Sequence, residues 1–223
     1  MRIETVPKLL FLLNFCSLLF CDPIGLFIPP EGWECVQSRD FPKTIQVGFL
    51  KKSSTAFKPS LNLATERVSV SFKEYLAAAR RVHEQELHVE WRDLGDFLCR
   101  AGKGRLIEIR SASPCGEVKM LQAILVQDGF AYVLTGAARK EDFPLERKEI
   151  LRSLRSLWVV PDLFAAIGDL NKRTILEQAL DSSEENRERA WKSYCKTLLD
   201  YQDLGSYWVF LALQRGHTKF FVE

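Results

Sequence analysis

Short segments with the pattern of β-strands recur between residues 33 and 135. Predicted strands cover residues 33–36, 44–50, 61–70, 89–94, 105–110, 118–127 and 130–135. Asp128 and Gly129 lie between the last two, and such a two-residue loop predicts a tight hairpin because both positions require positive φ.

The segment 118–127 is apolar on both of its alternating faces. Ile124 and Val126 belong to one face, and Leu121 and Leu125 to the other. A strand of this kind is covered on both sides. We therefore expect helices on both faces of the sheet.

Two amphipathic helices are predicted around these strands. Ser71 and Glu74 form a capping box that starts the first. Its apolar positions recur at helical spacing: Phe72, Tyr75, Leu76, Ala79, Val82 and Leu87. The second begins near Pro144 and presents Ile150, Leu151, Leu154, Leu157 and Trp158. The predicted fold is α/β of the α+β kind, with an antiparallel sheet sandwiched between helices.

The pattern becomes helical after Pro161. Segments 163–180 and 184–204 have helical periodicity, and Gly205 ends the second. The last stretch, residues 207–222, fits a helix or a hairpin equally well. We expect an α/β domain over residues 28–160 and a mainly helical C-terminal extension over residues 161–223.

The N-terminus has the layout of an export signal. Arg2 and Lys8 precede the apolar run of residues 9–20. Residues 1–21 are therefore predicted to be a signal peptide that directs the chain to an extracytoplasmic place, periplasmic or membrane-associated in a bacterium. Lipidation of Cys21 is a weaker alternative because bulky Phe20 precedes it. A buried N-terminal helix is the other alternative, and it would leave the chain in the cytosol.

The composition is that of an ordinary globular protein, with 47% hydrophobic and 27% charged residues. This balance excludes disorder over long stretches. The formal net charge of +2 gives no general attraction to nucleic acid, so no nucleic-acid partner is expected.

Four cysteines follow the predicted signal: Cys35, Cys99, Cys115 and Cys195. An oxidising compartment would allow disulfides between them, and the sequence does not choose among the three pairings. The alternative, slightly favoured, is that all four are small buried hydrophobic residues.

The sequence contains no convincing catalytic or metal-binding motif. His83 and His88 lie five residues apart, whereas a helical zinc site needs four, so we expect an exposed polar helix end there. The Gly-rich segment 101–105 is predicted to be a turn, since it lacks the spacing of a phosphate-binding loop. We predict no enzyme activity, no catalytic residue, no cofactor and no metal.

Two features are candidate partner surfaces. Basic residues cluster around the second predicted helix, but acidic residues interleave with them, the usual pattern of a solvated face. Aromatic residues gather in the C-terminal extension, and such residues anchor interfaces. The predicted partner-binding set is Trp191, Tyr194, Tyr201, Tyr207 and Trp208. Core packing against the first domain explains these aromatics equally well.

The order of predicted elements resembles the PsbP-like fold family, which includes the extrinsic PsbP proteins of photosystem II and related bacterial exported proteins. The matching residues are those that open the first helix, 71–75, and the hairpin with its second strand, 127–138. Phe143 and residues 150–154 follow. The resemblance covers about residues 28–160.

The resemblance implies a non-enzymatic accessory or binding protein that docks onto a larger protein assembly. It does not name the partner. A cytosolic chaperone or adaptor is the alternative function, and an enzyme of unknown type is a third. Membrane association through the N-terminal segment is a further expectation of the export signal.

Overall fold

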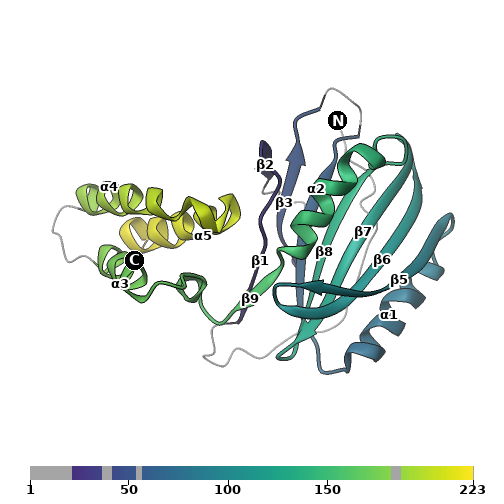
Figure 1. Cartoon of the computed structure of the whole chain (residues 1–223), viewed down its shortest axis with the longest axis horizontal. Helices are drawn as coiled ribbons and strands as arrows, with labels where there is room; N and C mark the ends of the chain where they lie inside the picture. Colours follow the sequence, from purple (N-terminus) through teal and green to yellow (C-terminus); the bar gives the residue numbers. More distant parts are fainter. Residues whose placement is uncertain (1–21, 37–41, 54–56, 182–186, 223) are drawn as a thin grey trace.

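A computed structural model describes residues 22–36, 42–53, 57–181 and 187–222, and it contains one large antiparallel sheet (Figure 1). The predicted signal, residues 1–21 with Cys21, lies outside the described residues. The strands of the large sheet are β2 (Trp33–Val36), β3 (Ile45–Lys51), β4 (Ser60–Arg67), β5 (Val89–Cys99), β6 (Gly102–Ser113), β7 (Gly116–Gln127) and β8 (Phe130–Arg139).

The seven strands follow the order β2-β3-β4-β8-β7-β6-β5, and neighbouring strands are antiparallel. The predicted hairpin joins β7 to β8, where Asp128 and Gly129 have φ of 51° and 78°. Both values are those that the tight turn requires. The prediction of this turn is confirmed.

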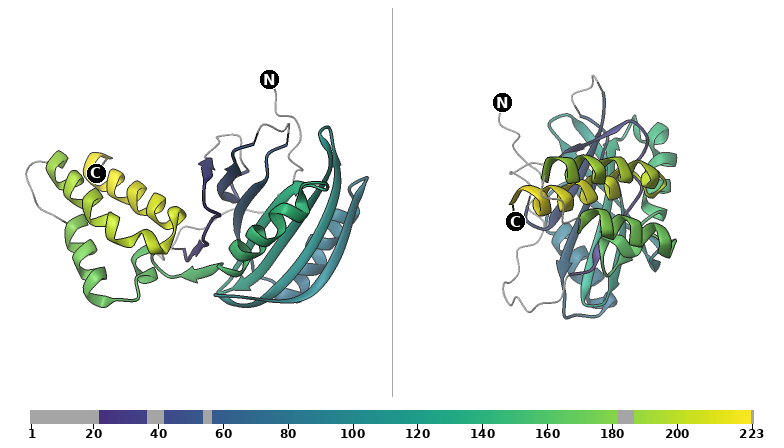
Figure 2. Two further views of the ribbon diagram at one scale, coloured as in Figure 1. Left: turned by 45° about the horizontal axis from the view of Figure 1, so that its top comes forward. Right: turned by 90° about the vertical axis from the view of Figure 1, so that its left-hand side faces the viewer.

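Helices α1 (Phe72–Glu84) and α2 (Phe143–Arg155) cover opposite faces of the sheet (Figure 2). The capping box is present in α1, since the Ser71 side chain accepts from the Glu74 backbone and Glu74 from the Ser71 backbone. The helix ends at Glu84, so Leu87 is 88% exposed and does not belong to its apolar face.

Each face of the sheet has its own hydrophobic core. On the α2 face, Leu121 and Leu125 pack with Ile150 and Leu151. On the α1 face, Ile124 packs with a cluster that includes Tyr75. The predicted fold class, an antiparallel sheet between helices, is confirmed.

A second, two-stranded sheet that the sequence did not predict pairs β1 (Ile24–Leu26) with β9 (Trp158–Val160). It brings the start of the described chain onto the α2 face. A β-carbon on Gly25 would lie 2.8 Å from Cδ1 of Tyr132, so only glycine allows β1 to approach β8 this closely. The sequence signal was weak because three-residue strands show no periodicity.

The C-terminal extension is helical, as predicted, but its boundaries differ. Its elements are η1 (Leu163–Ala166), α3 (Leu170–Leu180), α4 (Arg187–Leu198), η2 (Leu199–Leu204), α5 (Ser206–His217) and η3 (Thr218–Val222). The predicted helix 163–180 is broken before Asp169, which caps α3 by accepting from the backbone N–H of Asn171 and Lys172. The final stretch is a helix rather than a hairpin.

The extension projects to one side of the sheet (Figure 1). Its base is not separate from the first unit, because one hydrophobic cluster runs from β3 and β4 through Phe27 to Tyr207 and Trp208. The rings of Phe27 and Tyr207 have centroids 5.2 Å apart. No helix within the described ranges is long and apolar enough to cross a bilayer.

Candidate functional sites

Four of the five aromatic residues predicted to bind a partner are buried. Tyr194, Tyr201, Tyr207 and Trp208 are each 3% exposed or less. Only Trp191 is partly exposed. Tyr207 packs against Phe27 and Phe49, as the alternative of core packing against the first domain expected. The side chains of Tyr194, Tyr201 and Trp208 hydrogen-bond within the helical extension.

Hydrogen bonds satisfy the polar ends of these buried aromatics. The indole Nε1 of Trp208 donates to the backbone oxygen of Leu163 at 2.8 Å, and the Tyr194 hydroxyl donates to that of Ala212 at 2.9 Å. Burial raises the pKa of the Tyr194 hydroxyl. These residues tie α4 and α5 to η1 and to each other.

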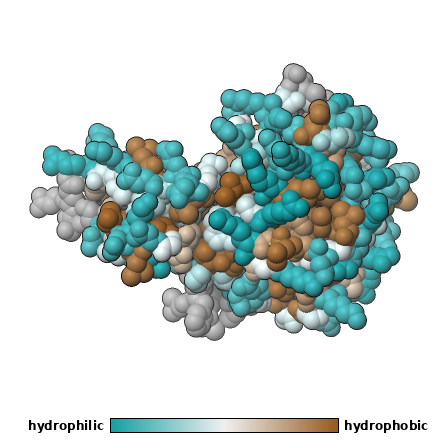
Figure 3. Space-filling model, viewed as in Figure 1, coloured by the Kyte–Doolittle hydropathy of each residue, from teal (hydrophilic) through white to brown (hydrophobic). Residues whose placement is uncertain are grey.

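Trp191 belongs to a group of rings at the free end of the extension, which we call the aromatic end cluster: Trp191, His217, Phe220 and Phe221. The Trp191 ring lies 5.9 Å from Phe221 and 6.2 Å from His217. His217 and Phe221 are exposed, and Val222 beside them is 70% exposed. Apolar residues appear among polar ones on the projecting extension (Figure 3).

A second candidate site is a pocket on the α1 face, which we call the α1-face pocket. Its floor comes from β4, β6, β7 and β8, and its walls from α1 and the residues that lead into β3. It encloses about 150 Å³ and its lining is mostly apolar, with Ile45, Ile109, Met120 and Val133 among the residues. The pocket exists because α1 lies over the β5 side of the sheet, which it contacts most.

His83 lines this pocket and is only 4% exposed. The centroid of its ring lies 5.1 Å from that of Trp91, with the two ring planes tilted by 31°. Neither ring nitrogen has a hydrogen-bond partner within the described part of the chain. Burial lowers the pKa of the imidazole, so the neutral form is favoured. The predicted exposed helix end is therefore wrong for His83.

A signal for this burial was present in the sequence. His83 follows Tyr75 and Ala79 at intervals of four residues, so all three lie on one side of the helix. Both of those residues are buried. The helix face was predicted from hydrophobic residues alone, so the histidine was left out of it.

Other polar groups line the same pocket. The Tyr75 hydroxyl donates to the Glu66 carboxylate, and burial together with this neighbour raises the tyrosine pKa. Gln122 and Thr135 lie on the floor and are each 6% exposed. The pocket thus combines an apolar body with a few polar groups, as small-molecule sites do.

No group of three or more metal-ligating side chains is placed to hold a metal within residues 22–36, 42–53, 57–181 and 187–222. His88 is exposed in a turn with φ of 64°. The four cysteines Cys35, Cys99, Cys115 and Cys195 are free thiols. The prediction that all four are buried is wrong for Cys35 and Cys115, which are exposed.

The segment 101–105 contains a turn, as predicted, but β6 starts within it at Gly102. Gly104 faces the backbone of β7, where a β-carbon would lie 2.4 Å from the Ile124 oxygen. Arg105 is paired with Asp93 at 2.8 Å and with Asp96 at 2.7 Å.

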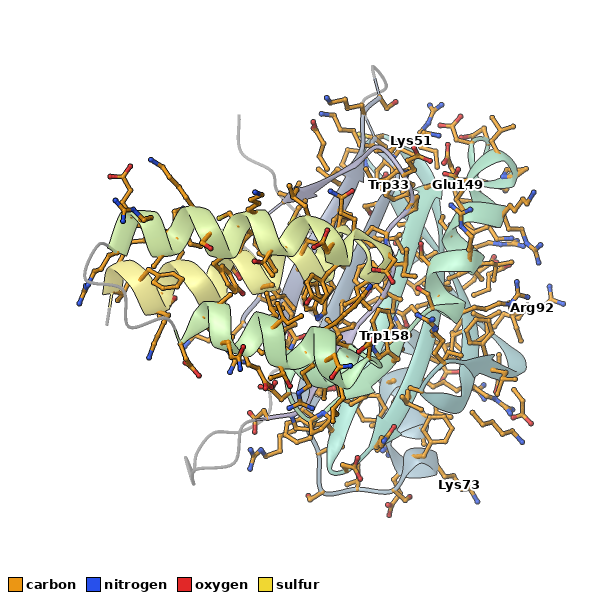
Figure 4. The ribbon with its side chains drawn as sticks, turned by 60° about the vertical axis from the view of Figure 1, so that its left-hand side comes forward. Trp33, Lys51, Lys73, Arg92, Glu149 and Trp158 are labelled. Atoms are coloured by element: carbon orange, nitrogen blue, oxygen red, sulfur yellow. The ribbon has the colours of Figure 1, made fainter. Side chains whose placement is uncertain are left out.

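Basic residues near both α1 and α2 form ion pairs, and on α1 Arg80 pairs with Glu84 at 2.7 Å. Around α2, Lys51 pairs with Glu146, Arg139 with Asp142, and Lys140 with Glu117. These ion pairs agree with a solvated face of mixed charge. Near α1, Lys73 and Arg92 point outward (Figure 4).

No protein-family model and no curated protein matches the chain. Solved structures with a similar fold include LpqN of Mycobacterium tuberculosis, at 11% identity, covering 62% of this chain and 84% of that one, with a TM-score of 0.49. Cyanobacterial PsbP from Synechocystis sp. PCC 6803 is 11% identical to this chain. The match covers 66% of this chain and 98% of that one, with a TM-score of 0.43. A Pseudomonas aeruginosa protein of unknown function is 14% identical to this chain. The match covers 54% of this chain and 94% of that one, with a TM-score of 0.41. These structures include a member of the fold family that the sequence resembles, and the likeness concerns the fold alone.

Proposed function

We propose that this chain is an exported, non-enzymatic binding protein that docks onto a larger protein assembly through the aromatic end cluster of its C-terminal extension. The observation that carries the proposal is the exposure of Phe221 and Val222, 45% and 70%, beside a partly exposed tryptophan at the projecting end of the molecule.

The composition of this cluster suits docking. Aromatic side chains bury a large area with few rotatable bonds, and they dominate the energetics of protein interfaces. Trp191 is held in place by the stacked ring of Tyr194, 6.1 Å away. An interface residue that is already ordered loses less conformational entropy on binding.

The extension is also rigidly joined to the sheet. Tyr207 packs against Phe27 and Phe49, whose ring centroids lie 5.2 Å and 6.1 Å from its own. A partner bound at the end cluster would therefore be held at a defined distance and orientation from the sheet. That is what an accessory subunit of an assembly requires.

Quantitative photo-crosslinking in cells tests the docking. The partner set of the full chain is compared with those of the Phe221→Ser and Trp191→Ala variants, and with Leu145→Ala as the matched control. Leu145 is 80% exposed on α2 and lies outside the cluster. We expect one partner to be kept by the control and lost by both cluster variants.

An unchanged partner set in both cluster variants would contradict docking through this surface. Export is tested separately with a reporter enzyme fused after Pro30, where the basic and apolar pattern of residues 2–20 predicts activity outside the cytoplasm. A reporter that stays in the cytosol would favour a chaperone or adaptor there.

A further inference from the structure

We infer that the α1-face pocket is a binding site for a small, mainly apolar molecule that carries one hydroxyl group, which hydrogen-bonds to the ring of His83. This site is separate from the docking surface proposed above, because the pocket lies between α1 and the sheet.

The first step of the argument is size. The pocket encloses about 150 Å³, and an engineered apolar protein cavity of about this volume binds benzene. A single aromatic ring or an aliphatic chain of similar volume therefore fits. A larger ligand would extend out of the open side of the pocket.

The second step is the polarity of the lining. Most of the floor is apolar, with Ala131 and Val133 0% and 9% exposed, and Gln122 and Thr135 are polar residues within it. Such a surface favours an apolar ligand body, because the ligand loses contact with water on entering. A negatively charged ligand would lose its hydration beside the carboxylates of Glu66 and Glu86, which line the pocket.

The third step is His83, whose ring nitrogens are both shielded from solvent and have no hydrogen-bond partner among the described residues. A small rotation of the ring toward the cavity brings a nitrogen to a ligand atom. A neutral imidazole carries one donor and one acceptor nitrogen. Buried polar groups are almost always paired, so an unpaired one in a pocket marks the place for a ligand atom or water. A hydroxyl group matches the ring because it both donates and accepts.

Neighbouring residues restrict where the His83 ring can move. Trp91 on β5 stacks on one side of its ring, and the helical face with Tyr75 and Ala79 fixes its backbone. Tyr75 itself is already engaged by Glu66, so it does not compete for the histidine. His83 is thus the pocket's available polar group on α1.

Phenol and benzene form a matched pair of probes, since they differ by one hydroxyl group. Each is titrated into the full chain and followed by NMR of the histidine ring nitrogens and by calorimetry. We expect phenol to bind with a Kd about tenfold lower than that of benzene, the factor that one hydrogen bond contributes. Phenol should shift the His83 ring signals, and benzene should shift them much less.

Substitutions assign the binding to this pocket. His83→Leu should remove the preference for phenol and leave benzene binding within about threefold, since a net hydrogen bond is lost and the apolar contacts stay. His83→Gln should restore part of the preference. Ala64→Leu fills the pocket from the floor and should abolish binding of both probes. Ala112→Leu, an exposed strand position outside the pocket, is its matched control.

The outcomes decide the inference. Failure of phenol to bind the unmodified chain saturably overturns it, as does a preference that His83→Leu leaves unchanged or binding that Ala64→Leu leaves unchanged. If the histidine variants do not fold, the Ala64→Leu and Ala112→Leu pair together with the His83 signals of the unmodified chain still gives the answer. Loss of partner crosslinks in the end-cluster variants tests the proposed docking and has no bearing on ligand binding in the pocket.

Discussion

Gly136 on β8 lies directly under Ile150 of α2: a β-carbon on the glycine would be 2.4 Å from Cγ2 of the isoleucine. Because Ile150 is fully buried, it has no free space to move into. The close approach of α2 to the sheet therefore depends on a glycine at this position.

Gly136→Ala is expected to destabilise the protein by about 1–3 kcal/mol, the usual cost of overpacking a buried contact. The matched control is Gly168→Ala, where a new β-carbon would meet nothing within 4 Å. Urea unfolding followed by circular dichroism measures both. Equal stability of the two variants would show that α2 can shift without cost.

The ion pair between Lys51 on β3 and Glu146 on α2 joins two elements that are far apart in sequence. The lysine Nζ lies 2.9 Å and 3.1 Å from the two carboxylate oxygens, and the glutamate side chain is only 8% exposed. Lys51→Met would leave that carboxylate largely desolvated and without its lysine partner, so we expect a loss of about 1–3 kcal/mol of stability.

Lys52→Met is the control for this change. Its partner Glu34 is 59% exposed, and exposed pairs contribute less than about 1 kcal/mol. Chemical denaturation at low and high salt measures the free energy of unfolding of both variants and compares the two losses. A loss for Lys52→Met as large as that for Lys51→Met would count against the role of burial.

His83 should make the stability of the protein depend on pH in the acidic range. Burial lowers its pKa in the folded state, so below the ordinary value of 6.5 the unfolded chain takes up the proton more readily. The stability that the neutral ring contributes is present above pH 6.5 and is lost as the pH falls through the lowered folded pKa.

The His83→Leu variant isolates this contribution, because it retains Glu66 and Glu86, the acidic residues of the pocket lining. Thermal unfolding is measured between about pH 7 and pH 5, the range around the ordinary histidine pKa. We expect a flatter profile for the variant than for the unmodified protein. Parallel profiles would mean that His83 has the same pKa in the folded and unfolded chains, which would contradict the effect of its burial.

Buried tyrosines should make the protein sensitive to alkali. Burial raises the pKa of Tyr132 to about 12, and also raises those of Tyr75, Tyr194 and Tyr207. Above pH 10 the unfolded chain releases phenolic protons that the folded chain keeps, so stability is present below pH 10 and falls as the pH rises.

Absorbance of tyrosinate during an alkaline titration measures this effect. We expect these four hydroxyls to ionise only together with loss of the folded circular dichroism signal. Tyr201, whose hydroxyl donates to the Lys172 backbone oxygen, has a pKa raised by burial as well and should follow them. Ionisation well before unfolding would contradict the burial of these rings.

Local signals in the sequence predicted most of the fold. Asp128 and Gly129 predicted the hairpin because its turn needs positive φ at two adjacent positions, and few residues other than these accept it. Ser71 and Glu74 predicted the start of α1 because their side chains bond to each other's backbone. Both signals act over a few residues, so no tertiary contact was needed to recognise them.

The sites were less predictable. The aromatic residues of the extension looked like docking residues because a side chain's type does not show which way its helix faces. The structure buried four of them and left Trp191 at the edge. His83 was missed for the opposite reason, since a polar residue on a buried helix face breaks the hydrophobic pattern that defines the face.

The sequence by itself determined the sheet, its two covering helices and the helical character of the C-terminal extension, because periodicity and capping are local. Only the tertiary structure decided where α1 crosses the sheet, and therefore that a pocket lies beside it, lined by a histidine without a hydrogen-bond partner in the described part of the chain. It also decided that Gly25 brings β1 against Tyr132, a contact between residues more than a hundred positions apart. Such contacts depend on the packing of whole elements, and no short stretch of sequence encodes them.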